Sequence, residues 1–307
     1  MSTSQTTPSS IQSPLDTSAN AILIEKIDKE FIIGKYWEEL NIDVSKQFNS
    51  IDHIGLFQCT NTGFRFFFPS TIAGDGGFYG QLNSQRPYYH KWNWEQALAC
   101  NYINNGDDIL DVGCGEGSFL IDIRKRKSGI KCLGIDINKT AVEEAKKKGI
   151  DAICCTPEEF NKSNDQKFDV ITVFQVLEHI PNVVSFTQCL STLLKPNGKL
   201  IVSVPNNAPY YDTFEKYNVL NLPPHHMGWW DKDSLFNLGR LLNLRVLEQN
   251  IEPVRSYKRK LLFRYENQLQ LRSLVSVIPA FLVKIYFKLK KNNYSGRHIM
   301  TIYSRTS

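Results

Sequence analysis

The chain has 307 residues, of which 42% are hydrophobic and 22% charged, and its formal net charge is +5. This length corresponds to about two domains, or to one large α/β domain with additions. The ordinary globular composition excludes a fibrous or largely disordered chain, and each long apolar stretch is interrupted before the ~20 residues that a membrane span needs. The seven cysteines contain no Cys-x-x-Cys spacing, which predicts reduced thiols and a cytoplasmic location.

Composition divides the chain into three parts. Residues 1–20 are rich in Ser and Thr and contain no Lys or Arg, so they are predicted to form a disordered leader. Residues 21–90 are rich in aromatic side chains and show no alternation of strands and helices, which indicates an N-terminal lid or accessory subdomain. Residues 91–307 form the third part, in which a helical insertion is predicted at 254–293.

From about residue 98 onward, short β-branched or aliphatic runs alternate with helical stretches. This alternation is typical of an α/β fold with a parallel sheet and helices on both faces. Asn138 and Asp231 are placed to cap two of the helices. The predicted strands are 108–112, 131–135, 151–154, 168–174, 199–204, 244–249 and 297–304, and the predicted helices are 118–127, 139–148, 183–194 and 232–242.

The most informative segment joins a predicted strand to a predicted helix through a turn with three glycines, Gly113, Gly115 and Gly117. Such glycines let the backbone approach a ligand at a helix N-terminus. Asp136 ends the next predicted strand, a little over twenty residues after Gly113. From that position a carboxylate can accept hydrogen bonds from both hydroxyls of a ribose. The segment therefore predicts a nucleotide-type ligand.

Electrostatics separates two ligands of this type. A dinucleotide places an anionic pyrophosphate on the turn, and its fingerprint has glycine where this chain has Ser118. Asp111 and Glu116 flank the turn; carboxylates there repel a pyrophosphate but attract an ammonium and a sulfonium. S-adenosylmethionine carries both cations and is the predicted cofactor. The alternative is that the two acids are only solvated loop residues.

These residues resemble the class I S-adenosylmethionine-dependent methyltransferases, and within them the ubiquinone-type O-methyltransferases. The resemblance is carried by four ordered motifs. It implies a Rossmann-like sheet of seven strands with the last strand antiparallel. The motifs are DVGCGEG at 111–117 followed by Asp136, FDVI at 168–171, QVLEHIP at 175–181 and LKPNGKL at 194–200.

The resemblance also implies which residues hold the donor. Two glycines would pass under its methionine part, one acid would lie near its ammonium and another would bind the ribose. An acid after the third strand would face the adenine amine, and two residues at the end of the fourth strand would border the donor from the other side. In that order these residues are Gly113, Gly115, Asp111, Asp136, Glu158, Phe174 and Gln175.

Three histidines are candidates for contact with the methyl acceptor. A general base is needed only when the nucleophile carries a proton. His179 follows the fourth strand of the domain, and His225 and His226 lie in a loop after the fifth; both places face the edge where open α/β sheets bind ligands. The alternative for each is a loop histidine that only bonds to backbone.

Aromatic residues are the candidates for covering the site. Tyr88, Tyr89 and Trp229 are predicted to contact substrate or to form part of a lid, because aromatic rings can cover a sulfonium and exclude water. The alternative is that they dock the N-terminal subdomain on the sheet. No metal is predicted: ubiquinone-type enzymes have been linked to metal through a Glu three residues before Glu178-His179, and here that position is Gln175.

The sequence therefore predicts a methyltransferase that acts on an O or N atom of a small molecule, such as a sugar or glycan precursor, a quinone or a secondary metabolite. The alternatives are a nucleic-acid methyltransferase, which is disfavoured because no Asn/Asp-Pro-Pro-Tyr-type sequence ends the fourth strand, and a non-catalytic module that only binds the donor. Residues 281–291 are a candidate amphipathic helix for peripheral membrane contact, or else a surface helix packed on its own fold.

Overall fold

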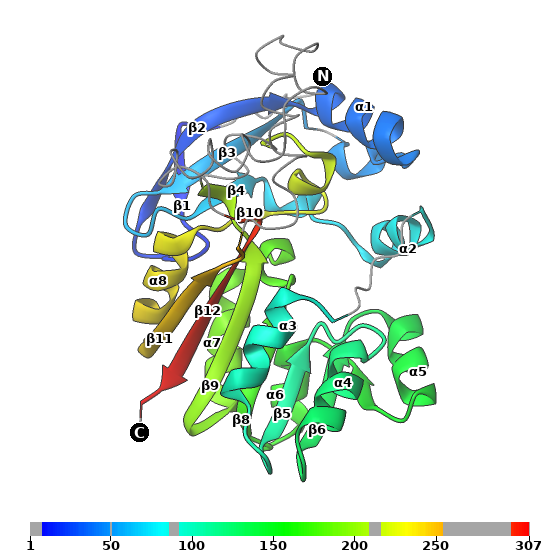
Figure 1. The fold of residues 1–307 in the computed structure, drawn as a ribbon. Helices are drawn as coiled ribbons and strands as arrows, with labels where there is room; N and C mark the ends of the chain where they lie inside the picture. Colours follow the sequence, from blue (N-terminus) through cyan, green and yellow to red (C-terminus); the bar gives the residue numbers. More distant parts are fainter. Residues whose placement is uncertain (1–7, 50, 86–91, 209–215, 254–295, 307) are drawn as a thin grey trace, which may run out of the picture.

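Two β-sheets organise the part of the chain that the structure describes, which comprises residues 8–49, 51–85, 92–208, 216–253 and 296–306 (Figure 1). In this computed structural model the larger sheet has seven strands in the order β11-β12-β9-β8-β5-β6-β7. Its strands are β5 (Asp108–Val112), β6 (Lys131–Asp136), β7 (Asp151–Cys154), β8 (Phe168–Phe174), β9 (Leu194–Pro205), β11 (Leu244–Ile251) and β12 (His298–Arg305).

The larger sheet has the predicted topology. β5 pairs in parallel with β6 and β8, and β8 pairs in parallel with β9. β12, which comes last in the chain, is antiparallel to both of its neighbours, β9 and β11. The prediction of a seven-stranded Rossmann-like sheet with an antiparallel last strand is confirmed, and the strand bounds agree with the sequence prediction within a few residues.

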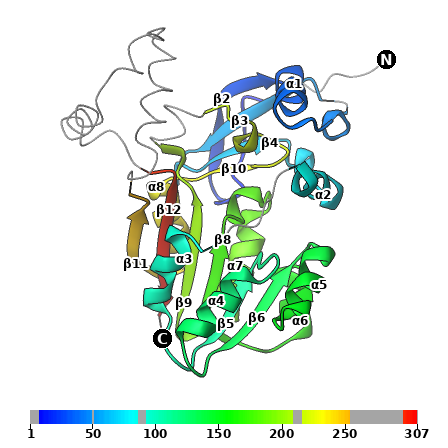
Figure 2. The same ribbon diagram turned by 45° about the vertical axis from the view of Figure 1, so that its right-hand side comes forward.

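Helices cover both faces of the larger sheet, as predicted (Figure 2). Asn138 and Asp231 cap α5 and α8 through their side chains, also as predicted. α3 and α6 are additional short helices that the periodicity did not indicate. On one face lie α3 (Trp94–Ala99), α4 (Ser118–Arg126) and α5 (Lys139–Lys147), and on the other α6 (Pro157–Ser163), α7 (Val183–Leu193) and α8 (Lys232–Leu241).

The smaller sheet is antiparallel and lies beyond the carboxyl ends of the parallel strands (Figure 1). Its strands, in order, are β1 (Ser10–Gln12), β2 (Asn20–Asp28), β3 (His53–Cys59), β4 (Arg65–Phe68) and β10 (Gly228–Trp229). Short helices accompany it and the loop before β10: α1 (Lys29–Leu40), η1 (Ser45–Phe48), η2 (Ser70–Ile72), α2 (Gly76–Gln85) and η6 (Val219–Asn221), while η3 (Cys100–Tyr102) follows α3.

The prediction of a disordered leader is wrong for residues 8–20, which contribute to the smaller sheet. β1 pairs with β2 over Ser10–Gln12, and Leu15 and Ala19 are 2% and 5% exposed. Pairing with a neighbouring strand and burial of apolar side chains outweigh the local polar composition. Residues 1–7 lie outside the described residues.

The N-terminal part is joined to the rest of the chain by hydrogen bonds as well as by sequence. β10 comes from the second half of the chain and pairs with β4, with Gly228 opposite Phe66. Side chains alternate along β4: Phe66 packs in the core shared with α7 and α8, whereas Phe67 packs with α1, α2 and the loop before β10. The subdomain at 21–90 therefore also takes in residues near 228.

Several predicted features lie outside the described residues: Tyr88 and Tyr89, the insertion at 254–293 and the segment at 281–291. Among the residues that are described, no helix combines the length and the apolar character needed to cross a membrane. All seven cysteines are described, and each carries a free thiol.

Candidate functional site

The glycine-rich turn between β5 and α4 has a backbone conformation that favours glycine. Gly113, Gly115 and Gly117 have φ angles of 77°, 53° and 75°, in the left-handed region where a Cβ is costly. The N–H of Gly113 donates to the carbonyl oxygen of Ile135 at 2.8 Å, which ties the turn to β6. A Cβ on Gly113 would lie 2.3 Å from Cγ2 of Val176. The turn therefore has no room for a side chain at Gly113.

Asp111 is a buried acid beside this turn. Asp111 is 3% exposed, and its Oδ1 accepts a 2.7 Å hydrogen bond from Oγ1 of Thr172. Burial raises the pKa of Asp111 to about 7; the Thr172 hydrogen bond opposes this shift, and the nearby Asp136 adds to it. A cation brought to the turn would favour the ionised carboxylate. Asp111 therefore fits the expected partner of an ammonium group.

Asp136 has both carboxylate oxygens fixed by backbone donors. Oδ2 accepts from the N–H of Gly115 and Oδ1 from the N–H of Asn138, each at 2.8 Å. Burial raises the pKa of Asp136, and these backbone hydrogen bonds oppose the rise. Each oxygen keeps acceptor capacity for a further donor, so the half-buried carboxylate fits the expected partner of two ribose hydroxyls.

Glu116 does not act with Asp111 in the way the sequence argument assumed. Its Oε2 lies 2.6 Å from Nζ of Lys148, the C-cap residue that follows α5. The lysine offsets the charge of this carboxylate, so it contributes little attraction for a cationic ligand. Of the two acids next to the glycines, Asp111 is the one whose charge is not offset by a described ion pair.

Other expected donor contacts lie around the same edge of the sheet. Phe174 ends β8, and its ring packs edge-on against Phe119 of α4 with centroids 5.0 Å apart. Glu158 lies in α6, where it accepts a long 3.5 Å hydrogen bond from Oγ of Ser185 on α7. Their roles in donor binding stay predictions.

Gln175 has an unusual backbone conformation, and its side chain contacts a buried acid that the sequence reasoning missed. Its φ angle is +56°, and its side-chain amide donates to Oε1 of Glu95 at 2.5 Å and to Oγ of Ser203 at 3.3 Å. Oγ of Ser203 also donates to Glu95, at 2.7 Å. Glu95, from α3, is 2% exposed. No local pattern links Glu95 to Gln175, because the contact joins residues 80 positions apart.

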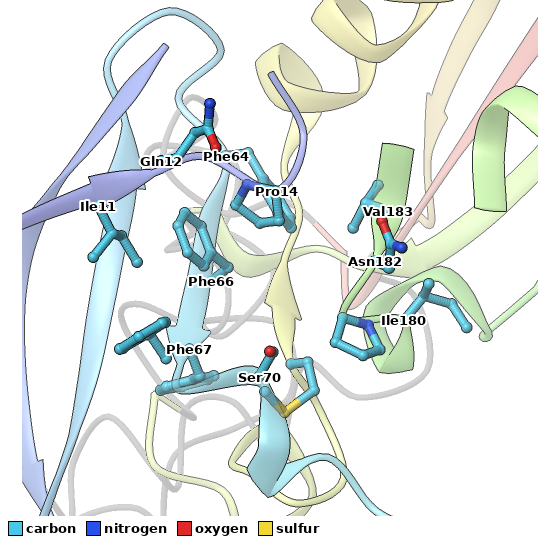
Figure 3. Close-up of a pocket in the computed structure, with 13 residues that line it drawn as sticks. Ile11, Gln12, Pro14, Phe64, Phe66, Phe67, Ser70, Ile180, Asn182 and Val183 are labelled. Carbon is cyan, nitrogen blue, oxygen red and sulfur yellow. The ribbon is translucent and has the colours of Figure 1, made fainter. Parts of the chain in front are cut away.

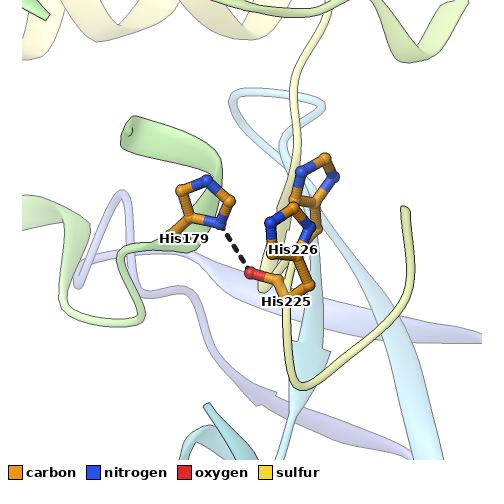
Figure 4. A group of neighbouring side chains, drawn as sticks. All are labelled: His179, His225 and His226. Atoms are coloured by element: carbon orange, nitrogen blue, oxygen red, sulfur yellow. Dashed lines mark hydrogen bonds between the residues drawn. The ribbon is translucent and has the colours of Figure 1, made fainter. Parts of the chain in front are cut away.

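The three candidate histidines lie together in the structure (Figure 4). His179 ends η4 (Leu177–His179), directly after β8, and its ring centroid lies 4.5 Å from that of His225 and 5.0 Å from that of His226. The rings of His225 and His226 stack, with centroids 4.5 Å apart and an interplanar angle of 19°. The fold therefore brings together the two loops that the sequence proposed for the acceptor.

Hydrogen bonds set the tautomers of two of these rings. Nδ1 of His179 lies 2.6 Å from the carbonyl oxygen of His225, and Nδ1 of His225 lies 2.8 Å from that of Leu220. A carbonyl oxygen only accepts, so Nδ1 is the donor in both contacts. When these rings are neutral, the lone pair is therefore on Nε2.

Burial disfavours the charged forms of His179 and His226. It lowers the pKa of His179 to about 4, although the carbonyl groups of His225 and Gln175 oppose the shift. It also holds the pKa of His226 well below its usual value, and the neighbouring histidines add to that effect. Burial raises the pKa of the adjacent Glu178 carboxyl well above its ordinary range. Burial thus works against charge on His179, His226 and Glu178.

Tyr79, from the aromatic-rich part of the chain in which a lid was predicted, is a further neighbour of this cluster. Its ring lies 5.7 Å from His179 and 6.1 Å from His225, and its hydroxyl donates a long 3.5 Å hydrogen bond to the carbonyl oxygen of His225. Burial raises the pKa of Tyr79. The aromatic-rich stretch thus reaches the histidines from α2.

Trp229 was predicted to contact substrate or to form part of a lid, but the structure places it in the core. It is 1% exposed, its indole N–H donates to the carbonyl oxygen of Asn221 at 2.8 Å, and its ring packs edge-on against Phe67. The pairing of β10 with β4 carries this side chain into the core, so the structure gives Trp229 a packing role.

The histidine cluster bears on the prediction of a metal-independent site. Its three candidate ligand atoms lie within 4.8 Å of one another, a wider limit than the roughly 3.4 Å between nitrogens bound to one tetrahedral zinc ion. The side chain of Gln175 is engaged by Glu95 and Ser203, and burial raises the pKa of Glu178. The sequence reasoning weighed only residues 175, 178 and 179 for metal and did not foresee the three imidazoles. Metal independence stays a prediction.

Comparisons with known proteins agree with this architecture. A model of the methyltransferase domain family matches residues 83–249, more than half of the chain. A ubiquinone biosynthesis O-methyltransferase of Pasteurella multocida is 36% identical over 116 residues, covering 33% of this chain and 47% of the relative. One of Histophilus somni is 40% identical over 151 residues, covering 44% and 60%. The chain thus spans about half the length of the curated relatives it matches.

A solved structure with a similar fold is that of an S-adenosylmethionine-dependent methyltransferase from Archaeoglobus fulgidus. It superposes with a TM-score of 0.51 at 16% identity and covers 74% of this chain and 100% of that one. At this identity the likeness concerns the fold.

Proposed function

This chain belongs to the methyltransferase domain family and has the fold of its class I S-adenosylmethionine-dependent members, and we propose that it methylates a hydroxyl group of a small molecule. The observation that carries the proposal is the pair Asp111 and Asp136 beside one glycine turn, at the sheet edge that also presents three clustered histidines. The name of the Pasteurella relative, an O-methyltransferase, supports oxygen over nitrogen as the acceptor atom.

The donor would be held by residues of the turn and of the strands beside it. Asp136 would accept from the ribose hydroxyls, Asp111 would face the ammonium, and the backbone of Gly113 and Gly115 would lie under the methionine part. Glu158, Phe174 and Gln175 would complete the donor site. When bound, S-adenosylmethionine supplies a methyl carbon that its sulfonium has already activated, so the protein mainly has to align the acceptor and exclude water.

We assign the acceptor hydroxyl to the histidine cluster. His179, whose Nδ1 bonds to the carbonyl oxygen of His225, would be a hydrogen-bonding partner of that hydroxyl. A pKa of about 4 is well below the value that best suits a general base at neutral pH. His179 would therefore orient the hydroxyl more than remove its proton ahead of transfer. The proton would leave to solvent as the new oxygen–carbon bond forms and the carbon–sulfur bond of the donor breaks. His225 and His226 would line the same side of the site.

We also propose that the reaction takes place in the cytoplasm and needs no metal. The seven free thiols, of which that of Cys154 is exposed, support a reducing compartment. Peripheral membrane contact through residues 281–291 stays a proposal on sequence grounds alone.

Transfer of label tests the proposal. Purified protein is incubated with methyl-labelled S-adenosylmethionine and a metabolite extract from cells, and the products are fractionated and identified by mass spectrometry. We expect label in a methyl ether of a small molecule. Label in the nucleic-acid fraction would support the alternative acceptor, and donor binding without transfer would support a non-catalytic module.

A further inference from the structure

A cavity of about 460 Å³ lies between the smaller sheet and the start of α7 (Figure 3). Strand β4 lines it with Phe66 and Phe67, the chain after η4 with Ile180 and Val183, and the loop before β10 with Met227. Its volume falls in the range of small-molecule sites, which are mostly apolar with a few polar groups at defined places.

The chemistry of the cavity selects an uncharged ligand. Among the described residues that line it, none is ionisable, and the polar side chains are those of Gln12, Ser70 and Asn182. All three belong to exposed residues, so they lie at the rim. A charged ligand would lose its hydration here with no counter-charge. An aromatic or alkyl group would instead bury apolar surface against phenylalanine rings.

The walls of the cavity and the histidine cluster are parts of one assembly. Ile180 directly follows His179, and Met227 directly follows His226. The N–H of Met227 donates to the carbonyl oxygen of Glu178 at 2.8 Å, and its carbonyl oxygen accepts from the N–H of Phe67 at 2.9 Å. The backbone N–H and carbonyl groups of Met227 thus link the loop before β10 to β4 and to η4. This link lies next to His226 in the chain.

We propose that this cavity binds the apolar part of the methyl acceptor, which would accordingly be an uncharged hydroxylated molecule with an aromatic or alkyl group. The proposal rests on the function proposed above and narrows it, because sugars and phosphorylated glycan precursors do not match an apolar site with no ionisable side chain. Much of the cavity wall, including Phe66 and Phe67, lies outside the residues 83–249 that the family model matches.

The test uses 2-naphthol as an uncharged, hydroxyl-bearing apolar probe, and two variants that narrow the cavity from its rim. Asn182→Trp and Ser70→Trp add bulk at exposed positions on opposite walls. Asn182 precedes α7 without a side-chain capping bond, so the helix loses no cap. Gln188→Trp, at an exposed position of α7 away from the cavity, is the matched control.

Calorimetric titration should show that the wild type and Gln188→Trp bind 2-naphthol equally and that both rim variants bind it at least about tenfold more weakly. Titration of the same variants with S-adenosylmethionine should give unchanged affinity, which shows that the donor site and the fold are intact. If both rim variants bind 2-naphthol like the wild type while donor binding is intact, the cavity proposal is wrong and the methyltransferase proposal stands.

Labelled donor distinguishes an acceptor site from an unrelated apolar site. With a metabolite extract as the source of acceptor, label should enter the ether-soluble fraction, and Asn182→Trp should reduce that incorporation by about the factor by which it weakens 2-naphthol binding. Label confined to water-soluble products would overturn the apolar acceptor while supporting methyl transfer. Absence of donor binding by the wild type would overturn the proposed function itself.

Discussion

Thr172 and Asp111 stand opposite each other on the neighbouring strands β8 and β5, and the threonine hydroxyl donates a 2.7 Å hydrogen bond to the carboxylate. Both residues are buried. The carboxyl group beside the glycine turn is therefore oriented by the sheet before any ligand arrives, and burial makes its ionisation costly. Ionisation of Asp111 should therefore make a contribution to the stability of the protein that depends on pH.

Asp111→Asn is expected to make the protein without ligand more stable at pH 8 and to change its stability little near pH 4. The folded-state pKa of Asp111 is raised to about 7, whereas the unfolded value is about 4. Between these values the folded state holds a proton that the unfolded state has released, so the free energy of unfolding falls as the pH rises. Urea unfolding of both proteins from pH 4 to pH 8 measures the difference. A wild-type curve no steeper than that of Asp111→Asn would contradict the raised pKa.

Asp136→Ala is expected to weaken S-adenosylmethionine binding by about 10- to 100-fold, as for the loss of hydrogen bonds to a charged acceptor. The change also removes the acceptor of the Gly115 N–H, so the glycine turn loses one of its anchors. Isothermal titration calorimetry measures the affinity. Asp151→Ala, at an exposed acid that begins β7 at the opposite edge of the sheet, should bind the donor like the wild type; equal weakening in both variants would argue against the assigned site.

His179→Gln is expected to reduce kcat by about 10- to 100-fold with unchanged donor affinity, a loss at the lower end of that for acid–base residues. Because burial lowers the pKa of His179 to about 4, the ring stays neutral from pH 6 to pH 8. The wild-type pH profile should therefore lack an acidic limb from this residue in that range. An inflection near pH 6.5 that disappears in His179→Gln would show that the histidine titrates at its ordinary value.

Gly113→Ala is expected to destabilise the fold by about 1–3 kcal/mol, which is the usual cost of overpacking and of a left-handed alanine. The new Cβ would meet Cγ2 of Val176 at 2.3 Å, and the φ angle of 77° adds strain. The double variant Gly113→Ala/Val176→Ala should recover the part that comes from the clash, with Val176→Ala alone as the reference. A double variant no more stable than Gly113→Ala would mean that the valine is not the obstacle.

Dialysis against EDTA is expected to leave methyl transfer unchanged. The site proposed here uses imidazoles as hydrogen-bonding groups and assigns no step to an ion. Metal content before and after dialysis, measured by inductively coupled plasma mass spectrometry, accompanies the activity assay. Loss of activity on chelation, with recovery on addition of zinc, would instead show that His179, His225 and His226 hold a metal.

The sequence was sufficient to predict the larger sheet because each of its elements has a local pattern. The strand at 168–174 is a short apolar run, and α5 begins at a capping Asn138 and is followed by Gly149 with a φ angle of 78°. The turn with its three glycines beside Asp136 was predictable for the same reason, since the glycines and Asp136 have a recognised spacing, while its contact with the donor stays a prediction. The sequence was enough to recognise the turn, but it did not show the ion pair that Glu116 makes with Lys148.

The features that could not be predicted depend on contacts between distant segments. Residues 8–20 have a disordered composition, yet they are ordered because β2 accepts β1 as a neighbour. The contact of Glu95 with Gln175 and the approach of Tyr79 to His179 join parts of the chain that share no periodicity. The prediction for Trp229 was wrong because nothing in the sequence around it shows that Gly228 and Trp229 pair with β4.

The short strand β10 restricts how the protein can be recombined with its relatives. Removing the first ninety residues would strip Gly228 and Trp229 of the strand they pair with, while grafting those ninety residues elsewhere would leave β4 with a bare edge prone to association. A functional hybrid would have to inherit both segments from the same parent. Natural variation in the N-terminal part should therefore be accompanied by matching variation in the loop that contains the paired histidines.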